Sequence, residues 1–234
     1  MNNHKPTLFF PVTIIAFFII TAIFLGNVAR GKDIDDVLTG IEAANASFKT
    51  MKADITFTRT ITLLESTETS QGELSYKKPQ KLYLKFYPPK NEVNIVDGKY
   101  VWVYHPNEKQ VEKYEMSRGR QSSQSMSFFE FGYGESVGEA KKNYEITLID
   151  TKGEEPKQVY TLNLKPKDPK SQYSGIKIWV EDGFWLPHKI ELGESGGEVV
   201  NTIELKNIKL NKGMSDKIFI FDVPRGVEVI ELFK

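Results

Sequence analysis

The sequence predicts an α+β protein, mainly β with helices, built on a strongly curved antiparallel sheet or incomplete, unclosed β-barrel of about eleven strands. Three observations lead to this fold class. Apolar residues first recur at helical spacing, and from residue 53 onward they alternate with polar residues in short, turn-bounded segments. Between two groups of such segments, residues 117–143 follow neither pattern. We expect the sheet to curl because exposed strand edges promote aggregation.

The helical part comes first. In residues 33–51, Ile34, Val37, Leu38 and Ile41 recur near the helical period, with Phe48 and Met51 continuing the series. Asp33 suits the N-cap position, and the acidic residues after it suit the positive end of the helix dipole. This stretch therefore predicts one amphipathic helix that packs by its apolar face.

The strands follow. The segment "ADITFTRTITLLE", residues 53–65, alternates apolar and polar residues and predicts a half-buried antiparallel strand. The further expected strands are Gln71–Tyr76, Lys81–Tyr87, Glu92–Val96, Tyr100–Tyr104, Gln110–Tyr114, Tyr144–Ile149, Val159–Leu164, Gly175–Val180, Trp185–Leu192, Glu198–Lys209 and Ile218–Phe221. Asp-Gly and Pro-containing turns separate them.

The central segment, "SRGRQSSQSMSFFEFGYGESVGEAKKN", holds Phe128, Phe129, Phe131 and Tyr133 among glycines and serines. We expect short helices and loops there that cross the sheet as a helical lid. Its aromatic residues, like those of the strands, fit either a packed core or the wall of an apolar cavity that holds a hydrophobic ligand.

The first 31 residues differ in kind from the rest. Lys5 precedes an apolar run, Leu8–Leu25, and small and polar residues follow it, which is the pattern of a secretory signal peptide. The run is long for a signal peptide, so an uncleaved membrane anchor is the alternative. We expect a signal peptide at residues 1–31 and a single domain at residues 32–234.

Composition and motifs argue against nucleic-acid binding, metal binding and catalysis. The chain has 31 basic and 31 acidic residues and no cysteine, so we expect neither nucleic-acid binding nor a thiolate metal site, and no N-terminal lipid attachment. His105 and His188 stand in turn regions without metal-ligand spacing, and no GxSxG motif occurs. We therefore expect no catalytic residue, metal or cofactor, and predict that the protein is not an enzyme.

One stretch carries a likeness to a known family. "SYKKPQKLYLKFYPPKNEVNIVDGKYVWVYHPNEKQV", Ser75–Val111, resembles the outer-membrane lipoprotein carrier family of the LolA type. The shared pattern consists of Lys78-Pro79, an aromatic and apolar strand, a proline linker, and Asp97-Gly98-Lys99 followed by Trp102, Tyr104 and Pro106. The segment "FIFDVPRGVEVIE", Phe219–Glu231, is similar to the closing strand of that family.

The resemblance implies a periplasmic carrier that holds acyl chains in an apolar cavity beneath helices. Such a protein binds acylated lipoproteins or lipid, receives them from an inner-membrane lipoprotein-releasing transporter, and passes them to an outer-membrane receptor. We expect it to be a monomer. The alternative is a LolA-like sensor of lipid or lipoprotein, or an envelope-stress regulator, that acts through a membrane partner.

The resemblance also implies site residues. Leu82, Leu84 and Phe86 share one strand face and match family positions that face the cavity, although simple core packing explains them too. Ile55 and Phe57 have the inward parity on the first strand, and Phe128, Phe129 and Phe131 suit a lid. The family has an arginine that holds the lid shut where this chain has Lys78, which lacks the planar fork of an arginine. Lys78 is therefore a candidate latch of another kind.

Overall fold

The computed structural model describes residues 1, 31–116, 133–134 and 136–232. Residues Lys32–Lys234 form one compact unit. Residues 2–30 of the predicted signal peptide and the lid residues Phe128, Phe129 and Phe131 lie outside the described part of the chain. Within that part, no helix combines the length and the apolar character that crossing a membrane requires.

The first element is helix α1, Ile34–Ser47. Asp33 caps it, because its side chain accepts hydrogen bonds from the backbone N–H groups of Asp35 and Asp36. The predicted helix is too long at its end, since Phe48 already has extended backbone angles and a strand begins at Thr50. Phe48 and Met51 are nevertheless buried, as the apolar pattern suggested.

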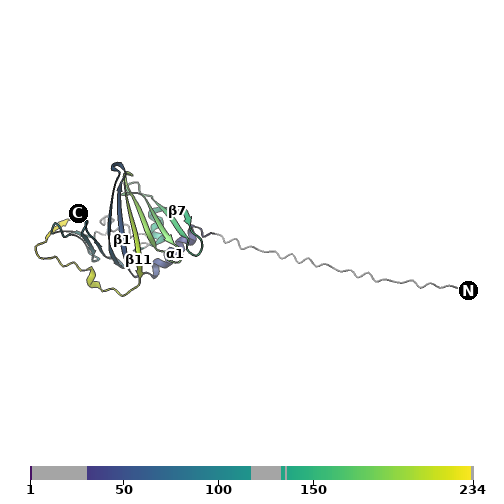
Figure 1. The fold of residues 1–234 in the computed structure, drawn as a ribbon, viewed down its shortest axis with the longest axis horizontal. Helices are drawn as coiled ribbons and strands as arrows, with labels where there is room; N and C mark the ends of the chain where they lie inside the picture. The colour runs from purple at the N-terminus through teal and green to yellow at the C-terminus, as the bar shows by residue number, and fades with distance from the viewer. Residues whose placement is uncertain (2–30, 117–132, 135, 233–234) are drawn as a thin grey trace. The chain divides into compact units, whose positions relative to one another are not determined.

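Among the described residues, twelve strands form a single sheet, which confirms a curved, unclosed sheet of about the predicted size (Figure 1). The strands are β1 Thr50–Ile61, β2 Ser66–Lys77, β3 Lys81–Phe86, β4 Glu92–Val96, β5 Tyr100–His105, β6 Gln110–Glu115, β7 Tyr144–Lys152, β8 Val159–Pro166, β9 Tyr173–Glu181, β10 Pro187–Glu194, β11 Val199–Leu210 and β12 Glu228–Leu232. Their spatial order is β12-β6-β5-β4-β3-β2-β1-β11-β10-β9-β8-β7. Every neighbouring pair is antiparallel except β12 with β6, which is parallel.

The structure corrects one predicted strand. Residues Ile218–Phe221 do not form one, because the 3-10 helix η3, Asp216–Phe219, includes the first two of them and the other two lie in no regular element. Ser215 caps this helix by accepting a hydrogen bond from Lys217 N, and the strand β12 follows later in the chain. The apolar alternation of 218–221 instead places Phe219 in a buried position beside an exposed Ile220.

The hairpin of β1 and β2 is longer than the apolar pattern predicts. Residues 66–70 of β2 are Ser, Thr and Glu, yet they pair in register with the second half of β1. Threonines face each other across the two strands, with hydroxyl oxygens 3.3 Å apart for Thr58 and Thr69 and 3.4 Å apart for Thr60 and Thr67. Cross-strand pairs of this kind stabilise a sheet without apolar side chains.

The central segment is helical where it is described. Helix α3, Val137–Asn143, begins after Ser136, whose hydroxyl accepts a hydrogen bond from Glu139 N. Two lysines in its last turn suit the negative end of the helix dipole. Its Ala140 is fully buried, and β7 starts directly after it.

Candidate functional site

One face of the sheet, here called the inner face, packs against α1. Along β1 the side chains of Met51, Ala53 and Ile55 point to this face, as their burial and that of α1 residues Val37 and Leu38 in the same apolar cluster show. Because cross-strand partners share a face, the register extends this surface over both sides of β1. The result is a continuous apolar surface with a helix over part of it.

The predicted cavity residues in the described part lie together on this inner face. Leu74 of β2 pairs with Leu84 of β3, and Gly72 pairs with both Ile55 and Phe86. The rings of Phe57 and Phe86 have centroids 6.1 Å apart. Ile55, Leu82, Leu84 and Phe86 expose at most 4% of their surface, so other atoms of the chain cover them here. A ligand that reaches them has to displace that cover.

Helix α1 is seated on the sheet by a close aromatic contact. A Cβ atom on Gly40 would lie 2.4 Å from the indole of Trp185, so only glycine lets the helix lie this close. Trp185 in turn stacks on Tyr160, with ring centroids 5.7 Å apart. At the helix start, Lys32 donates a hydrogen bond to Asp182, which fixes the same region from its other side.

The end of α1 is tied to the sheet through Lys78. Its ammonium donates to both the backbone and the side-chain oxygen of Asn45, each at 2.6 Å, and lies 4.9 Å from the centroid of the Phe48 ring. A cation here also suits the negative end of the helix dipole. Burial lowers the pKa of Lys78, while the charge of Glu42 opposes that shift. Lys78 thus makes two hydrogen bonds to the covering helix without an arginine fork.

Tyr133 belongs to the same contact region and was not among the predicted site residues. It is fully buried, its ring packs edge-on against Phe48 at 5.7 Å, and its hydroxyl donates to the backbone oxygen of Pro187. Burial raises the pKa of this hydroxyl. The sequence contained one hint of this role, because Tyr133 ends the aromatic cluster of the central segment. Nothing in the sequence, however, distinguished Tyr133 from the neighbouring phenylalanines.

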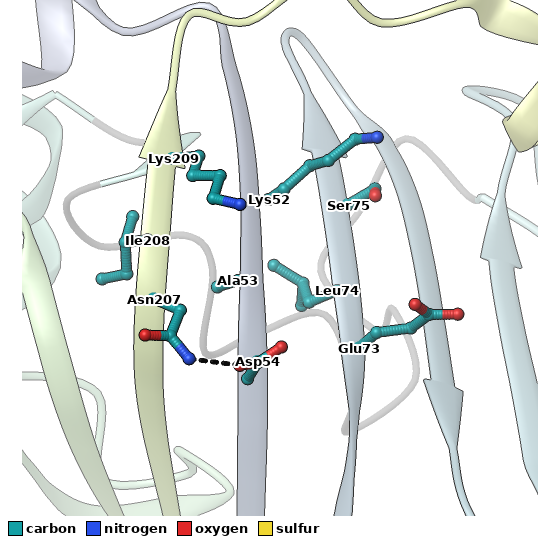
Figure 2. Close-up of a pocket in the computed structure, with 9 residues that line it drawn as sticks. All are labelled: Lys52, Ala53, Asp54, Glu73, Leu74, Ser75, Asn207, Ile208 and Lys209. Atoms are coloured by element: carbon teal, nitrogen blue, oxygen red, sulfur yellow. Dashed lines mark hydrogen bonds between the residues drawn. The ribbon is translucent and has the colours of Figure 1, made fainter.

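A cleft of about 530 Å³ lies over β1, β2 and β11, but its chemistry does not fit an acyl chain (Figure 2). Lys52, Lys209, Asp54 and Glu73 line it, and Asn207 donates a hydrogen bond of 2.6 Å to Asp54. The side chains of Lys52 and Asp54 are exposed and have the opposite parity to the buried side chains of β1. This cleft therefore belongs to the other face of the sheet, here called the outer face.

Some of the residues that carry the family resemblance, those around Asp97 and Phe221, meet on this outer face. Asp97 holds its turn by accepting hydrogen bonds from Lys99 N and Tyr100 N, both at 2.7 Å, and from the indole N–H of Trp102 at 3.0 Å. The ring of Phe221, from the second family-like segment, lies 5.5 Å from both Trp102 and Tyr104. The two motifs thus form one structural contact.

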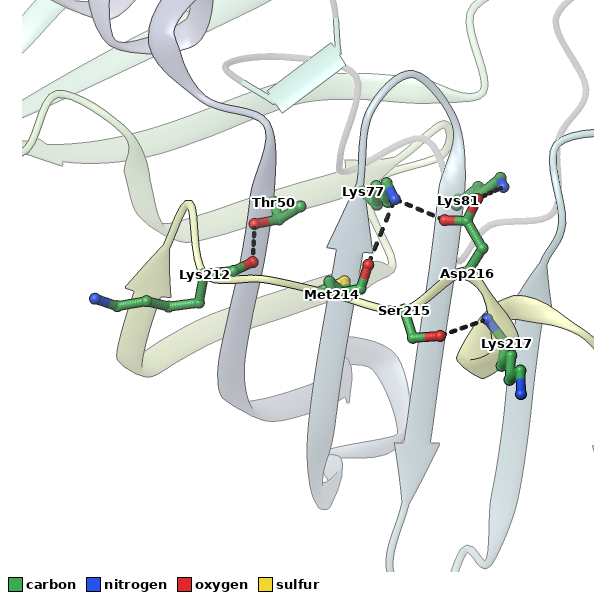
Figure 3. Close-up of polar contacts among 8 residues, drawn as sticks. All are labelled: Thr50, Lys77, Lys81, Lys212, Met214, Ser215, Asp216 and Lys217. Carbon is green, nitrogen blue, oxygen red and sulfur yellow. Dashed lines mark hydrogen bonds and ion pairs between the residues drawn. The ribbon is translucent and has the colours of Figure 1, made fainter.

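Residues 211–227, here called the strap, lead from β11 to β12 and bring Phe221 to this place. Polar contacts hold the strap to β1, β2 and β3 (Figure 3). Thr50 donates to Lys212 O at 2.8 Å, and Asp216 accepts from Lys77 at 2.7 Å and pairs with Lys81 at 3.1 Å. The hydrogen bonds from Lys77 and Lys81 lower the pKa of Asp216. The strap fastens one half of the sheet to the C-terminal strand.

The histidines do not form a catalytic or metal site in the part of the chain that the structure describes. His105 lies 3.8 Å from Glu92, and His188 has a buried Nδ1 without a hydrogen-bond partner. Burial lowers the pKa of His188. Across the same residues, no group of three metal-ligating side chains converges.

Known proteins resemble this chain both in sequence and in fold. The family model described as outer membrane lipoprotein carrier protein LolA matches residues 46–222. An uncharacterised protein of Methanocaldococcus jannaschii is 26% identical over 93% of this chain, and the chain spans 59% of that relative's length. An outer-membrane lipoprotein carrier protein of Pseudomonas putida is 23% identical over 93% of this chain and 98% of its own length.

A solved structure of a conserved protein from Thermus thermophilus has a TM-score of 0.53, with 11% identity, over 85% of this chain and 98% of its own. At this identity the likeness concerns the fold alone. The family match covers more than half of the sequence, from the end of α1 to the strap. The chain therefore belongs to the LolA family of outer membrane lipoprotein carriers, whose members are carrier and binding proteins, and it is not an enzyme.

Proposed function

We propose that this protein carries the acyl chains of a lipoprotein, or of another lipid, through the periplasm from the inner to the outer membrane. The observation that carries this proposal is the inner face, an apolar surface built from nearly every strand and covered in part by a helix that polar contacts fasten at its ends. The family match supports it. The signal-peptide pattern of residues 1–31 supports export.

The physical need for such a carrier is large. Each methylene withdrawn from water contributes about 0.8 kcal/mol, so a triacylated cargo with about 45 methylenes would cost on the order of 30–40 kcal/mol in water. No uncovered cargo leaves a membrane against that cost. A carrier offers an apolar surface in exchange, and it needs a cover that opens for loading and release.

Within the described residues, helix α1 is the candidate for this cover. Its fastenings include contacts of Lys78 with Asn45, of Lys32 with Asp182, and of the Glu42 side chain with Val137 N at 2.6 Å. Partly exposed polar contacts exchange with water at small net cost. Displacing α1 then opens part of the inner face, so that acyl chains can reach the buried residues Leu82, Leu84 and Phe86. In this view those three, with Ile55 and Phe57, form the acyl-chain bed.

The proposed partners are an inner-membrane transporter that releases the lipoprotein and an outer-membrane receptor that accepts it. The test begins with the cargo. The purified protein is incubated with membranes that contain an acylated lipoprotein, in parallel with the same lipoprotein lacking its acyl chains, and the supernatant is analysed by native mass spectrometry. We expect a soluble one-to-one complex with the acylated form alone.

A hydrogen-exchange measurement on the same samples examines the opening. Loading should increase exchange in α1 and leave the amides of β9 and β10 protected. A protein that never extracts acylated cargo, or that binds the acylated and unacylated forms equally, would refute the proposal.

A further inference from the structure

The inner face does not stay apolar along its whole length. In the register of β3 with β4, Leu82 pairs with Val96, Leu84 with Asn94, and Phe86 with Glu92. Partners share a face, so Asn94 and Glu92 point to the same side as the proposed acyl-chain bed. Moving along β4 away from Val96, the inner face therefore changes from apolar to polar within two pairs of residues.

Four side chains form this polar cluster: Lys90, Glu92, Asn94 and His105. Three of them converge on the carboxylate of Glu92: the Asn94 amide donates to it at 2.8 Å, the Lys90 ammonium lies at 3.3 Å, and His105 Nδ1 lies at 3.8 Å. Asn94 is 1% exposed, whereas the side chains of Lys90 and His105 are 32% and 26% exposed. The cluster is thus anchored in the core and open to solvent on its other side.

Two aromatic rings complete the arrangement. The Lys90 ammonium lies 4.2 Å from the centroid of the Phe86 ring and 5.3 Å from that of Phe57. A cation over aromatic faces and beside a carboxylate is the arrangement by which proteins bind organic ammonium groups. Lys90 itself comes from the exposed turn between β3 and β4, so its flexible stem can withdraw and leave this position to another cation.

We propose that the polar cluster binds the head of a zwitterionic amphiphile that carries an ammonium group and a phosphate, while the tail lies on the acyl-chain bed. The ligand's ammonium takes the place beside Glu92 and over the rings of Phe57 and Phe86. The displaced Lys90 ammonium pairs with the ligand's phosphate. This inference rests on the proposed function and names the class of lipid that the inner face accepts.

The charges of the cluster argue for a head with both signs. A purely anionic head would approach Lys90 but meet the carboxylate of Glu92, and a purely cationic head would meet the ammonium of Lys90. A head with both charges exchanges one partly exposed ion pair for two. The lost Lys90–Glu92 pair was worth little because water reaches Lys90.

The test compares single-chain lipids that share one acyl chain and differ in the head: phosphocholine, phosphoglycerol and uncharged glycerol. Affinities are measured by isothermal titration calorimetry below the micelle concentration. We expect the phosphocholine lipid to bind at least about tenfold more tightly than the other two, as charge-assisted contacts of this kind allow.

Variants identify the site. Lys90→Met and Glu92→Gln should each reduce the preference to within about threefold, because each removes one of the two charges that the head pairs with. Lys85→Met and Glu73→Gln are the matched controls, since this pair lies in register on the outer face of β2 and β3. Both controls should keep the full preference. Lys90 lies on an exposed turn, so its variant stays informative even where Glu92→Gln fails to fold.

Two unfavourable outcomes are distinct. Equal binding of all three lipids, or an unchanged preference in Lys90→Met, would overturn the head-group site and leave the carrier function standing. Binding of none of them, with no acylated lipoprotein bound either, would count against the carrier function itself.

Discussion

The two halves of the sheet are built differently on either side of β1. The half formed by β7 to β11, here called the aliphatic half, has an inner face made mostly of branched aliphatic side chains that are at most 5% exposed: Leu162, Leu164, Ile176, Ile178, Val180, Ile190 and Leu192. The half formed by β2 to β6 with β12, here called the motif half, carries the polar cluster on its inner face and the strap on its outer face.

The difference separates two tasks. Buried aliphatic residues in register on successive strands pack like a protein interior and resist change. The motif half has polar groups that reach solvent at the edge of its apolar surface, where they can discriminate between ligands. We therefore expect substitutions in the aliphatic half to act on stability and those in the polar cluster to act on binding.

The largest expected effect concerns the aliphatic half. Ile178 is fully buried and pairs with Ile190 on one side and Leu162 on the other. Ile178→Ala should lower the free energy of unfolding by about 2–5 kcal/mol, because it leaves a cavity in a packed surface. Urea unfolding followed by circular dichroism measures this, and Ile149→Ala, at a side chain that is 52% exposed, is the control. An equal loss of unfolding free energy in both variants would contradict the tightly packed interior assigned to the aliphatic half.

The next effect concerns the outer face of the motif half. Phe221→Ala removes the ring that packs on Trp102 and Tyr104 and should cost about 1–3 kcal/mol of unfolding free energy. Its neighbour Ile220 is 59% exposed, so Ile220→Ala should change little. Unfolding curves of both variants give the answer. If the two are equally stable, the strap does not support the motif half.

A smaller effect is expected at the seam between α1 and the motif half. Lys78→Met keeps an apolar stem against Phe48 but loses both hydrogen bonds to Asn45, at a cost of about 1 kcal/mol. Hydrogen exchange should rise in the last turn of α1 and stay unchanged in β9. Lys78→Arg, which retains the charge, should stay closer to the original protein. Uniform changes across the sheet would show that Lys78 is no latch.

The smallest effect depends on pH and lies in the aliphatic half. Burial lowers the pKa of His188 below its usual 6.5, although Glu181 and Glu204 oppose the shift and Lys189 adds to it. The unfolded chain therefore takes up a proton near pH 6.5 that the folded chain refuses, and stability falls as the pH drops below that value until it reaches the pKa of the folded state. His188→Gln should flatten this slope in urea unfolding between pH 7 and pH 5. Superimposable slopes would contradict the assignment.

The periodic parts of the fold could be predicted from the sequence because a strand that is buried on one face has apolar residues at alternate positions. The inner parity of Ile55, Phe57, Leu82, Leu84 and Phe86 followed from that alternation, and the register places them together. Their role as a ligand bed stays a prediction. Core packing and cavity lining select the same apolar side chains, so a sequence pattern cannot separate the two.

The misplaced elements are those that distant contacts decide. Residues 66–70 have no apolar pattern and become strand through pairing with β1, whereas 218–221 have such a pattern but begin inside a capped 3-10 helix of the strap. The polar cluster was missed because its members are scattered over a turn and two strands. Only the cross-strand register brings Lys90, Glu92 and His105 beside the phenylalanine rings.

The parallel pairing of β12 with β6 has a consequence for how the chain folds as it is synthesised. Lys113 and Glu231, which form an ion pair across these two strands, are 118 residues apart in the chain. During synthesis, β6 is made long before β12, and until β12 pairs with it the strand exposes a row of unpaired backbone donors and acceptors. Such an edge invites other chains to add to it. Shortening the chain before Glu228 should therefore produce aggregates rather than a slightly less stable protein.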